Sequence, residues 1–202
     1  MFGEIMLFID ILDIELMLLG GGLFLIAYWV LLNFTINYDQ QKLIEINKGF
    51  GFLFLALGIY VLATGLWGTF VWPLPSSYNL VLTDPWSLYG IALLALGFVN
   101  IYKVPIHGVL AGISILSIPI IVYGSVILHF GLTNSPTAAG AMYLLIGLNG
   151  LLSPILQTKA KKYWSYIALL LLILAGILAL YIGISASFEH TAGWMKWSPF
   201  YG

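Results

Sequence analysis

The chain has 202 residues, of which 61% are hydrophobic and only 7% charged, with a net charge of −1 and no cysteine. Soluble domains carry about 25% charged residues, so this composition argues against a water-soluble domain. Seven lysines without arginine argue against a nucleic-acid partner, and the lack of cysteine excludes disulfides, thiolate metal sites and cysteine nucleophiles.

Apolar stretches separated by short polar breaks run along the whole chain. A helix needs about 20 such residues to cross a hydrocarbon layer of about 30 Å. The sequence therefore predicts an all-α fold: a polytopic membrane helical bundle with six transmembrane helices in one integral domain over 1–202. The expected spans are 16–36, 49–71, 86–102, 104–132, 137–157 and 163–187.

The N-terminal stretch contains Glu4, Asp10, Asp13 and Glu15 but no lysine, so it lacks the positive region of a cleaved signal peptide. We expect it to be retained. Its acidic groups fall at the outer edge of the first span, where they are expected to form a rim reached by water.

A break in the apolar pattern, WPLPSSYN, follows the second span at 72–79. Its two prolines disfavour helix and predict an elbow between the second and third spans. One interpretation is a helix stop with aromatic side chains at the headgroup level. The other is a loop folded over the mouth of the bundle, whose ligand-contacting residues are Trp72, Ser76, Ser77, Tyr78 and Asn79.

The lysines predict the orientation of the helices. Six of the seven fall in or beside the breaks after the first, third and fifth spans, and only Lys196 falls on the opposite side. Since cytoplasmic loops carry the excess of lysine and arginine, both termini and the 72–86 loop are expected outside, in a multi-pass protein of the cell (plasma) membrane.

The expected spans hold no acidic or basic residue in their central parts, which disfavours an ion pump or a proton-coupled carrier. His129 and His190 are weak metal candidates, because both are expected outside but no further ligand is evident. No metal, other cofactor or catalytic residue is predicted, since motifs such as HExxH, GxSxG or a P-loop are missing.

Small and uncharged polar residues occur throughout the spans. Glycine pairs, including Gly58 with Gly65, Gly90 with Gly97 and Gly108 with Gly112, predict close helix contacts. The polar residues either bond between helices or line an uncharged path through the bundle. The candidates for such a path are Tyr89, Asn100, Tyr143, Asn149 and Tyr181.

The run GLWGTFVWPLPSSYNLVLTDPWSLYGIALL at 65–94 resembles the signature of an uncharacterised archaeal and bacterial family of multi-pass membrane proteins, a domain of unknown function marked by W-P-L-P-x-x-Y-N. The resemblance implies no established activity. SLYGIALLALGFVNIY at 87–102 is more weakly similar to a helix of the acid-gated urea channel and amide transporter family. That family's acid gating does not carry over, because the outer loops lack the histidine and acidic clusters.

These observations favour a bundle that binds or passes a small uncharged solute, since pore width and hydrogen-bonding groups can select such a solute without charge. The alternative is a non-catalytic accessory subunit of a larger membrane assembly, such as a respiratory complex. An enzyme is the least favoured class. The expected partners are the lipid bilayer and either further copies of the chain or other membrane subunits.

Overall fold

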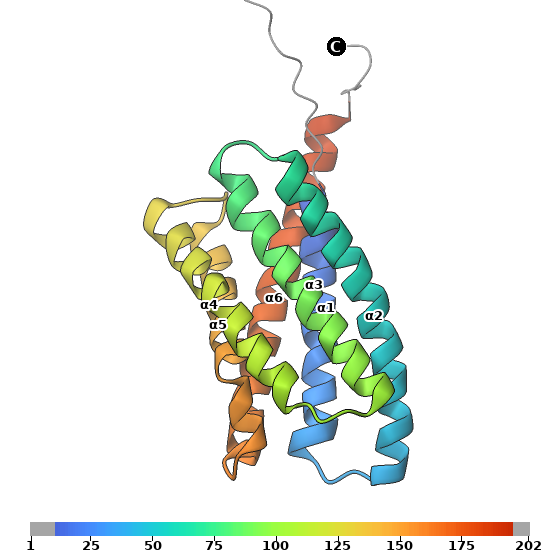
Figure 1. Cartoon of the computed structure of the whole chain (residues 1–202). Coiled ribbons are helices and arrows are strands. Elements are labelled where there is room, and N and C mark those ends of the chain that lie inside the picture. Colours follow the sequence, from blue (N-terminus) through green and yellow to red (C-terminus); the bar gives the residue numbers. More distant parts are fainter. Residues whose placement is uncertain (1–10, 196–202) are drawn as a thin grey trace, which may run out of the picture.

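The computed structural model describes residues 11–195, which form six long helices and two short helical turns (Figure 1). All six long helices are long and apolar enough to span a membrane within this part of the chain. They are α1 (Leu12–Val30), extended by the π-turn η1 (Leu31–Thr35), α2 (Gln40–Val71), α3 (Ser77–Tyr102), α4 (His107–Phe130), α5 (Pro136–Leu151), followed by the 3-10 turn η2 (Ser153–Gln157), and α6 (Lys161–Trp194). The predicted all-α membrane bundle is confirmed.

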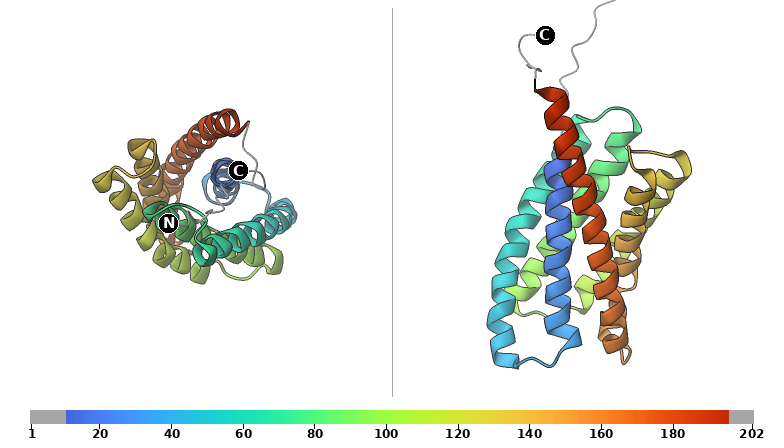
Figure 2. Two further views of the ribbon diagram at one scale, coloured as in Figure 1. Left: turned by 90° about the horizontal axis from the view of Figure 1, so that it is seen from above. Right: turned by 180° about the vertical axis from the view of Figure 1, so that it is seen from behind.

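The helices alternate in direction, so the loops collect at two ends of the bundle (Figures 1 and 2). The start of α1, the α2–α3 and α4–α5 loops and the end of α6 share one end, which we call the terminal end. The opposite end, which we call the lysine end, holds the turns after η1, α3 and η2. The lysines between 11 and 195 lie in or near those turns: Lys42, Lys48, Lys103, Lys159, Lys161 and Lys162.

Two helices, α2 and α3, begin more than two turns before the residue that the hydropathy pattern predicts. The second span was expected from 49, but α2 begins at Gln40, where the Asp39 side chain caps the helix by accepting from the Lys42 amide at 2.8 Å. The third was expected from 86, but α3 begins at Ser77 and includes Asp84 and Pro85. Hydropathy marks the lipid-compatible part of a helix and misses its polar turns.

Pro85 lies inside α3 without leaving a backbone acceptor unpaired. A proline has no amide hydrogen, so the carbonyl four residues earlier, that of Val81, loses its helical partner. The Tyr143 hydroxyl on α5 donates to that carbonyl at 3.0 Å. A contact between helices thus replaces the hydrogen bond that the proline removes.

Glycines bring three helix pairs into close contact: α2 with α3, α1 with α6, and α4 with α5. A Cβ added at Gly90 would lie 2.6 Å from the Leu62 amide nitrogen, and one at Gly20 would lie 2.9 Å from the Gly176 carbonyl oxygen. These approaches confirm the role expected for Gly58, Gly65, Gly90 and Gly97. Small residues let backbones approach where lipid removes the hydrophobic drive to associate.

The Gly108–Gly112 pair on α4 does not serve such a contact. A Cβ at either position would meet nothing within 4 Å. The expectation that this pair packs against a neighbouring helix is therefore wrong within the described chain, because no other described segment approaches α4 at these two positions.

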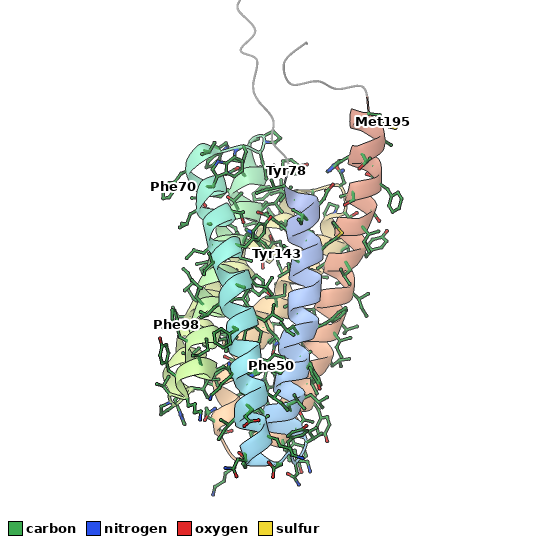
Figure 3. All side chains as sticks on the ribbon, turned by 90° about the vertical axis from the view of Figure 1, so that its right-hand side faces the viewer. Phe50, Phe70, Tyr78, Phe98, Tyr143 and Met195 are labelled. Atoms are coloured by element: carbon green, nitrogen blue, oxygen red, sulfur yellow. The ribbon has the colours of Figure 1, made fainter. Side chains whose placement is uncertain are left out.

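The perimeter of the bundle is apolar. Phe70 is 80% exposed and points away from the helices, as does Phe98, while Tyr143 lies among them (Figure 3). An exposed band of large apolar side chains is costly in water and favourable in lipid. The surface therefore agrees with the membrane assignment made from composition.

Candidate functional site

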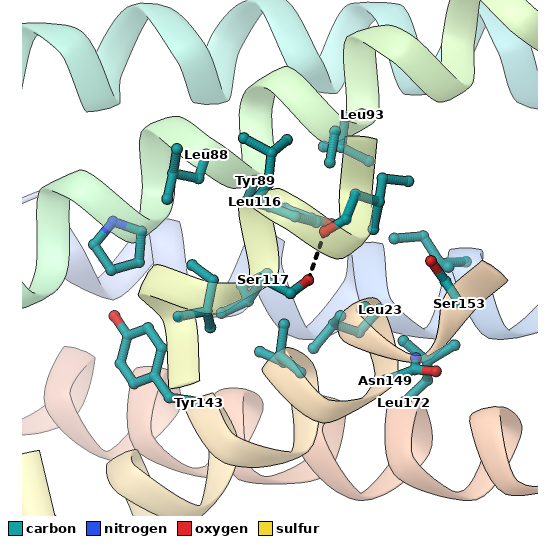
Figure 4. Close-up of a pocket in the computed structure, with 18 of the residues that line it drawn as sticks. Leu23, Leu88, Tyr89, Leu93, Leu116, Ser117, Tyr143, Asn149, Ser153 and Leu172 are labelled. Carbon is teal, nitrogen blue, oxygen red and sulfur yellow. Dashed lines mark hydrogen bonds between the residues drawn. The ribbon is translucent and has the colours of Figure 1, made fainter. Parts of the chain in front are cut away.

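A cavity of ≈150 Å³ runs between five of the helices. On α1 its lining residues recur every three or four positions, so that one face of this helix borders the cavity for almost its whole length. These α1 residues are Leu12, Glu15, Leu16, Leu19, Leu23, Ile26, Trp29 and Val30. Facing stretches of α3, α4, α5 and α6 close the other sides, and most of their side chains are aliphatic (Figure 4).

The cavity holds a few uncharged polar groups. Ser117 on α4 and Ser153 on η2 donate to the carbonyls of Ile113 and Leu110, at 2.7 and 3.1 Å, and their oxygens can still accept. Asn149 on α5 also borders the cavity, and its carboxamide makes no hydrogen bond within residues 11–195. Figure 4 shows Asn149 and Ser153 toward one end of the cavity and Tyr143 toward the other.

Tyr89 borders the cavity from α3. Its hydroxyl is buried against Gly22 on α1, where any Cβ would overlap it, and it has no hydrogen-bond partner among the described residues. An unpaired buried hydroxyl costs about 1–3 kcal/mol. The Tyr89 hydroxyl can therefore gain from a hydrogen bond to a molecule in the cavity.

The structure brings three of the five predicted path residues to this cavity: Tyr89, Tyr143 and Asn149. Of these, Tyr143 uses its hydroxyl for the contact with α3. The other two predicted residues, Asn100 and Tyr181, lie elsewhere.

Asn100 lies at the lysine end beside a second cavity of ≈270 Å³. Its side-chain oxygen accepts from the Trp29 indole nitrogen at 2.9 Å, and its amide donates to the Leu96 carbonyl. Asn33 and Asn47 border the same cavity and form a reciprocal pair of hydrogen bonds at 3.1 and 2.8 Å. Trp29 borders both cavities, so the Trp29–Asn100 bond lies between them.

Tyr181 was expected to line the path and does not. It is 60% exposed on α6, whose buried positions include Ala168, Leu172, Ala175 and Ala179. At about 100° per residue, Tyr181 stands about 200° around the helix from Ala179 and faces the lipid.

The 72–79 segment is a short connection, and only part of it is loop. Trp72 and Ser76 are exposed and have positive φ values of 55° and 53°, a region that costs energy for residues other than glycine. Ser77 and Tyr78 belong to the first turn of α3.

Asn79 is fully buried at 0% exposure. Its oxygen accepts from the Leu74 amide at 3.2 Å, and its amide donates to the Gly68 carbonyl and the Thr83 hydroxyl at 3.0 and 3.3 Å. As placed, Asn79 holds the end of α2, the loop and the start of α3 together, and its polar atoms are occupied by these contacts.

Acidic groups lie deeper than the sequence suggested. Glu15 was expected on a solvated rim but is only 3% exposed and borders the cavity near the terminal end. Asp84, which falls within the predicted 72–86 loop, lies in α3 and accepts from the hydroxyls of Thr69 and Tyr123, both at 3.0 Å. It thereby connects α2, α3 and α4. Glu4 and Asp10 lie outside the described residues.

The two histidines do not form a metal site in the described chain. His190 on α6 pairs with Asp13 on α1, Nδ1 to Oδ1, at 3.0 Å. His129 is exposed, with its ring edge against Phe130. Between residues 11 and 195, no three histidine, aspartate or glutamate side chains converge as metal ligands.

Six long apolar helices, five of which surround a mostly apolar cavity, define a polytopic helical membrane protein. The chain belongs to the family described as "Protein of unknown function (DUF981)", whose profile matches residues 6–193. Comparison with curated proteins and with solved structures found no match, so the similarity to the urea channel family gains no support there.

Proposed function

We propose that this protein binds a small uncharged molecule in the cavity between α1, α3, α4, α5 and α6. The observation that carries the proposal is the pairing of an apolar lining with an unbonded carboxamide at Asn149 and an unbonded hydroxyl at Tyr89. Ligand sites combine a largely apolar wall with a few placed polar groups that fix orientation.

The electrostatics of the lining favour a neutral ligand. Glu15 is the one ionisable carboxyl group bordering the cavity in the described chain, and the cavity wall there has no lysine. An anion would lose most of its hydration in such a site without gaining an opposite charge, and a cation would find a carboxyl group only at Glu15, near the terminal end and away from Asn149. A neutral molecule needs only one or two hydrogen bonds, which Asn149, Ser117 and Ser153 can supply.

Tryptophan fluorescence provides a direct test, because Trp29 and Trp86 border the cavity. The probe is 2-bromoethanol, a small uncharged alcohol whose bromine quenches indole emission. We expect saturable quenching in the purified protein. Asn149→Leu should weaken it about fivefold, the loss of roughly 1 kcal/mol for one hydrogen bond.

Tyr181→Leu is the matched control, because it removes a tyrosine that faces lipid. Its quenching curve should equal that of the unmodified chain. Quenching that rises linearly with probe and is the same in Asn149→Leu and Tyr181→Leu would contradict the proposal and favour the accessory-subunit alternative.

A further inference from the structure

The shape of the cavity restricts which uncharged molecules can bind in it. Its lining on α1 runs from Leu12 to Val30, which spans about 27 Å at about 1.5 Å per residue. That length approaches the thickness of the hydrocarbon layer, about 30 Å. The cavity therefore lies along the bundle and not across it.

The volume shows that this long cavity is narrow. The ≈150 Å³ is the space open to the centre of a water-sized sphere. Spread along about 27 Å, it gives a cross-section of roughly 5–6 Å², and adding the sphere radius of about 1.4 Å gives a tube about 5 Å wide. A linear hydrocarbon chain fits this width, and a compact molecule with the same number of carbons does not.

The polar groups occupy one part of the cavity. Asn149 and Ser153 lie on the last turn of α5 and on η2, close to the lysine end, and Ser117 lies in the middle of α4. Toward the terminal end the wall is formed by side chains such as Leu16, Leu82 and Pro85. The two polar groups on this part of the wall are already engaged, because Glu15 has an interaction of its own and the Tyr143 hydroxyl donates to Val81. The available hydrogen-bonding groups of α4, α5 and η2 therefore lie away from the terminal end.

We propose that the ligand is a single linear hydrocarbon chain with an uncharged hydrogen-bonding head. Its head contacts Asn149 and its tail extends toward the terminal end between Trp29 and Trp86. This inference rests on the proposed function and specifies its ligand class. Lipid and cavity are similarly apolar, so selection depends on shape and on the head contact.

Two brominated alcohols report the orientation of such a ligand. In 2-bromododecan-1-ol the bromine is next to the head, and in 12-bromododecan-1-ol it is at the end of the tail. Trp86 lies in the third turn of α3, nearer the terminal end, whereas Trp29 lies at the end of α1 near the lysine end. Trp86→Phe and Trp29→Phe variants each leave one cavity tryptophan beside the five other tryptophans of the chain, so the quenching of each cavity tryptophan is read as the part that is lost when that tryptophan is replaced.

The head-labelled alcohol should quench Trp29 at least twofold more than Trp86, and the tail-labelled alcohol should show the reverse. The compact probe 3-bromo-1-adamantanol should give only linear, unsaturable quenching of the unmodified chain. Ala92→Phe, which places a ring in the cavity wall, should abolish saturable quenching by both dodecanols. Ala63→Phe on the exposed side of α2 should leave it unchanged.

The inference would be overturned if the adamantanol quenched saturably and as strongly as the dodecanols. It would also be overturned if the ratio of Trp29 quenching to Trp86 quenching were the same for both dodecanols. These comparisons use the unmodified chain and the tryptophan variants, so they hold even if Ala92→Phe does not fold. If 2-bromoethanol binds while the dodecanols do not, only the chain-shaped ligand is wrong. If none of the probes binds, the proposed function is wrong as well.

Discussion

At the scale of single residues, polar side chains in this bundle mostly serve to hold backbone. Asn79 makes three hydrogen bonds from a site with no exposure, across the end of α2, the loop and the start of α3. Trp72 and Ser76 on the same connection adopt positive φ. Such conformations persist only where surrounding contacts enforce them.

Replacing Asn79 with alanine should lower the free energy of unfolding by about 1–3 kcal/mol, because buried partners lose their hydrogen bonds. Unfolding by SDS titration in mixed micelles measures the change. Ser77→Ala, at an exposed position two residues earlier, should stay within about 0.5 kcal/mol of the unmodified chain. Equal stabilities for the two variants would show that Asn79 does not hold the connection.

At the scale of helices, glycine and proline set how the elements meet. Gly90 packs against the backbone of α2 at Leu62, while Gly108 and Gly112 face open space on α4. Pro85 frees the Val81 carbonyl that Tyr143 then binds. A glycine therefore brings two helices together only when it lies on the face of its helix that meets a neighbour.

Gly90→Ala should separate α2 from α3 and destabilise the protein by about 1–3 kcal/mol, since its Cβ would overlap backbone that cannot move aside. Gly112→Ala should be neutral or stabilising by up to about 1 kcal/mol, because alanine favours helix and nothing lies within 4 Å. Thermal unfolding of the two variants side by side measures the contrast. A destabilised Gly112→Ala protein would indicate that this face packs against another chain.

The pairing of Tyr143 with Val81 can be tested by a double-mutant cycle. Tyr143→Phe should cost about 0.5–1.5 kcal/mol, because the Val81 carbonyl loses its partner. In a Pro85→Ala background the amide of residue 85 can bond that carbonyl, so the same substitution should cost much less. SDS titration of the four proteins gives the coupling energy, and strict additivity would refute the replacement of one bond by the other.

At the scale of the whole molecule, the structure divides the loops between two ends and places the described lysines at one of them. In membrane proteins the cytoplasmic loops carry the excess of lysine and arginine. We therefore expect the lysine end inside the cell and both termini outside. The expectation of which end faces the cytoplasm rests on charge. The division of the loops between two ends results from the alternating directions of the helices.

The chain contains no cysteine, which makes single-cysteine labelling straightforward. Ser76→Cys, at the terminal end, should react with a membrane-impermeant maleimide on intact cells. Thr158→Cys, in the exposed turn before α6, should react only after permeabilisation. The opposite result would invert the orientation, and labelling of both sites on intact cells would contradict the arrangement of the two ends.

The sequence by itself determined the membrane class, the number of helices, their approximate spans and the division of the loops, because each depends on the length of apolar runs and on the position of charge. It also gave Tyr89, Tyr143 and Asn149 as candidates, and the fold brings these three to one cavity. It could not separate these from Tyr181, nor place Glu15 in the interior or Asn79 in a network of backbone contacts. Only the tertiary structure decided those points, because lipid and protein interior are about equally apolar, and hydrophobicity therefore does not indicate which face of a membrane helix turns inward.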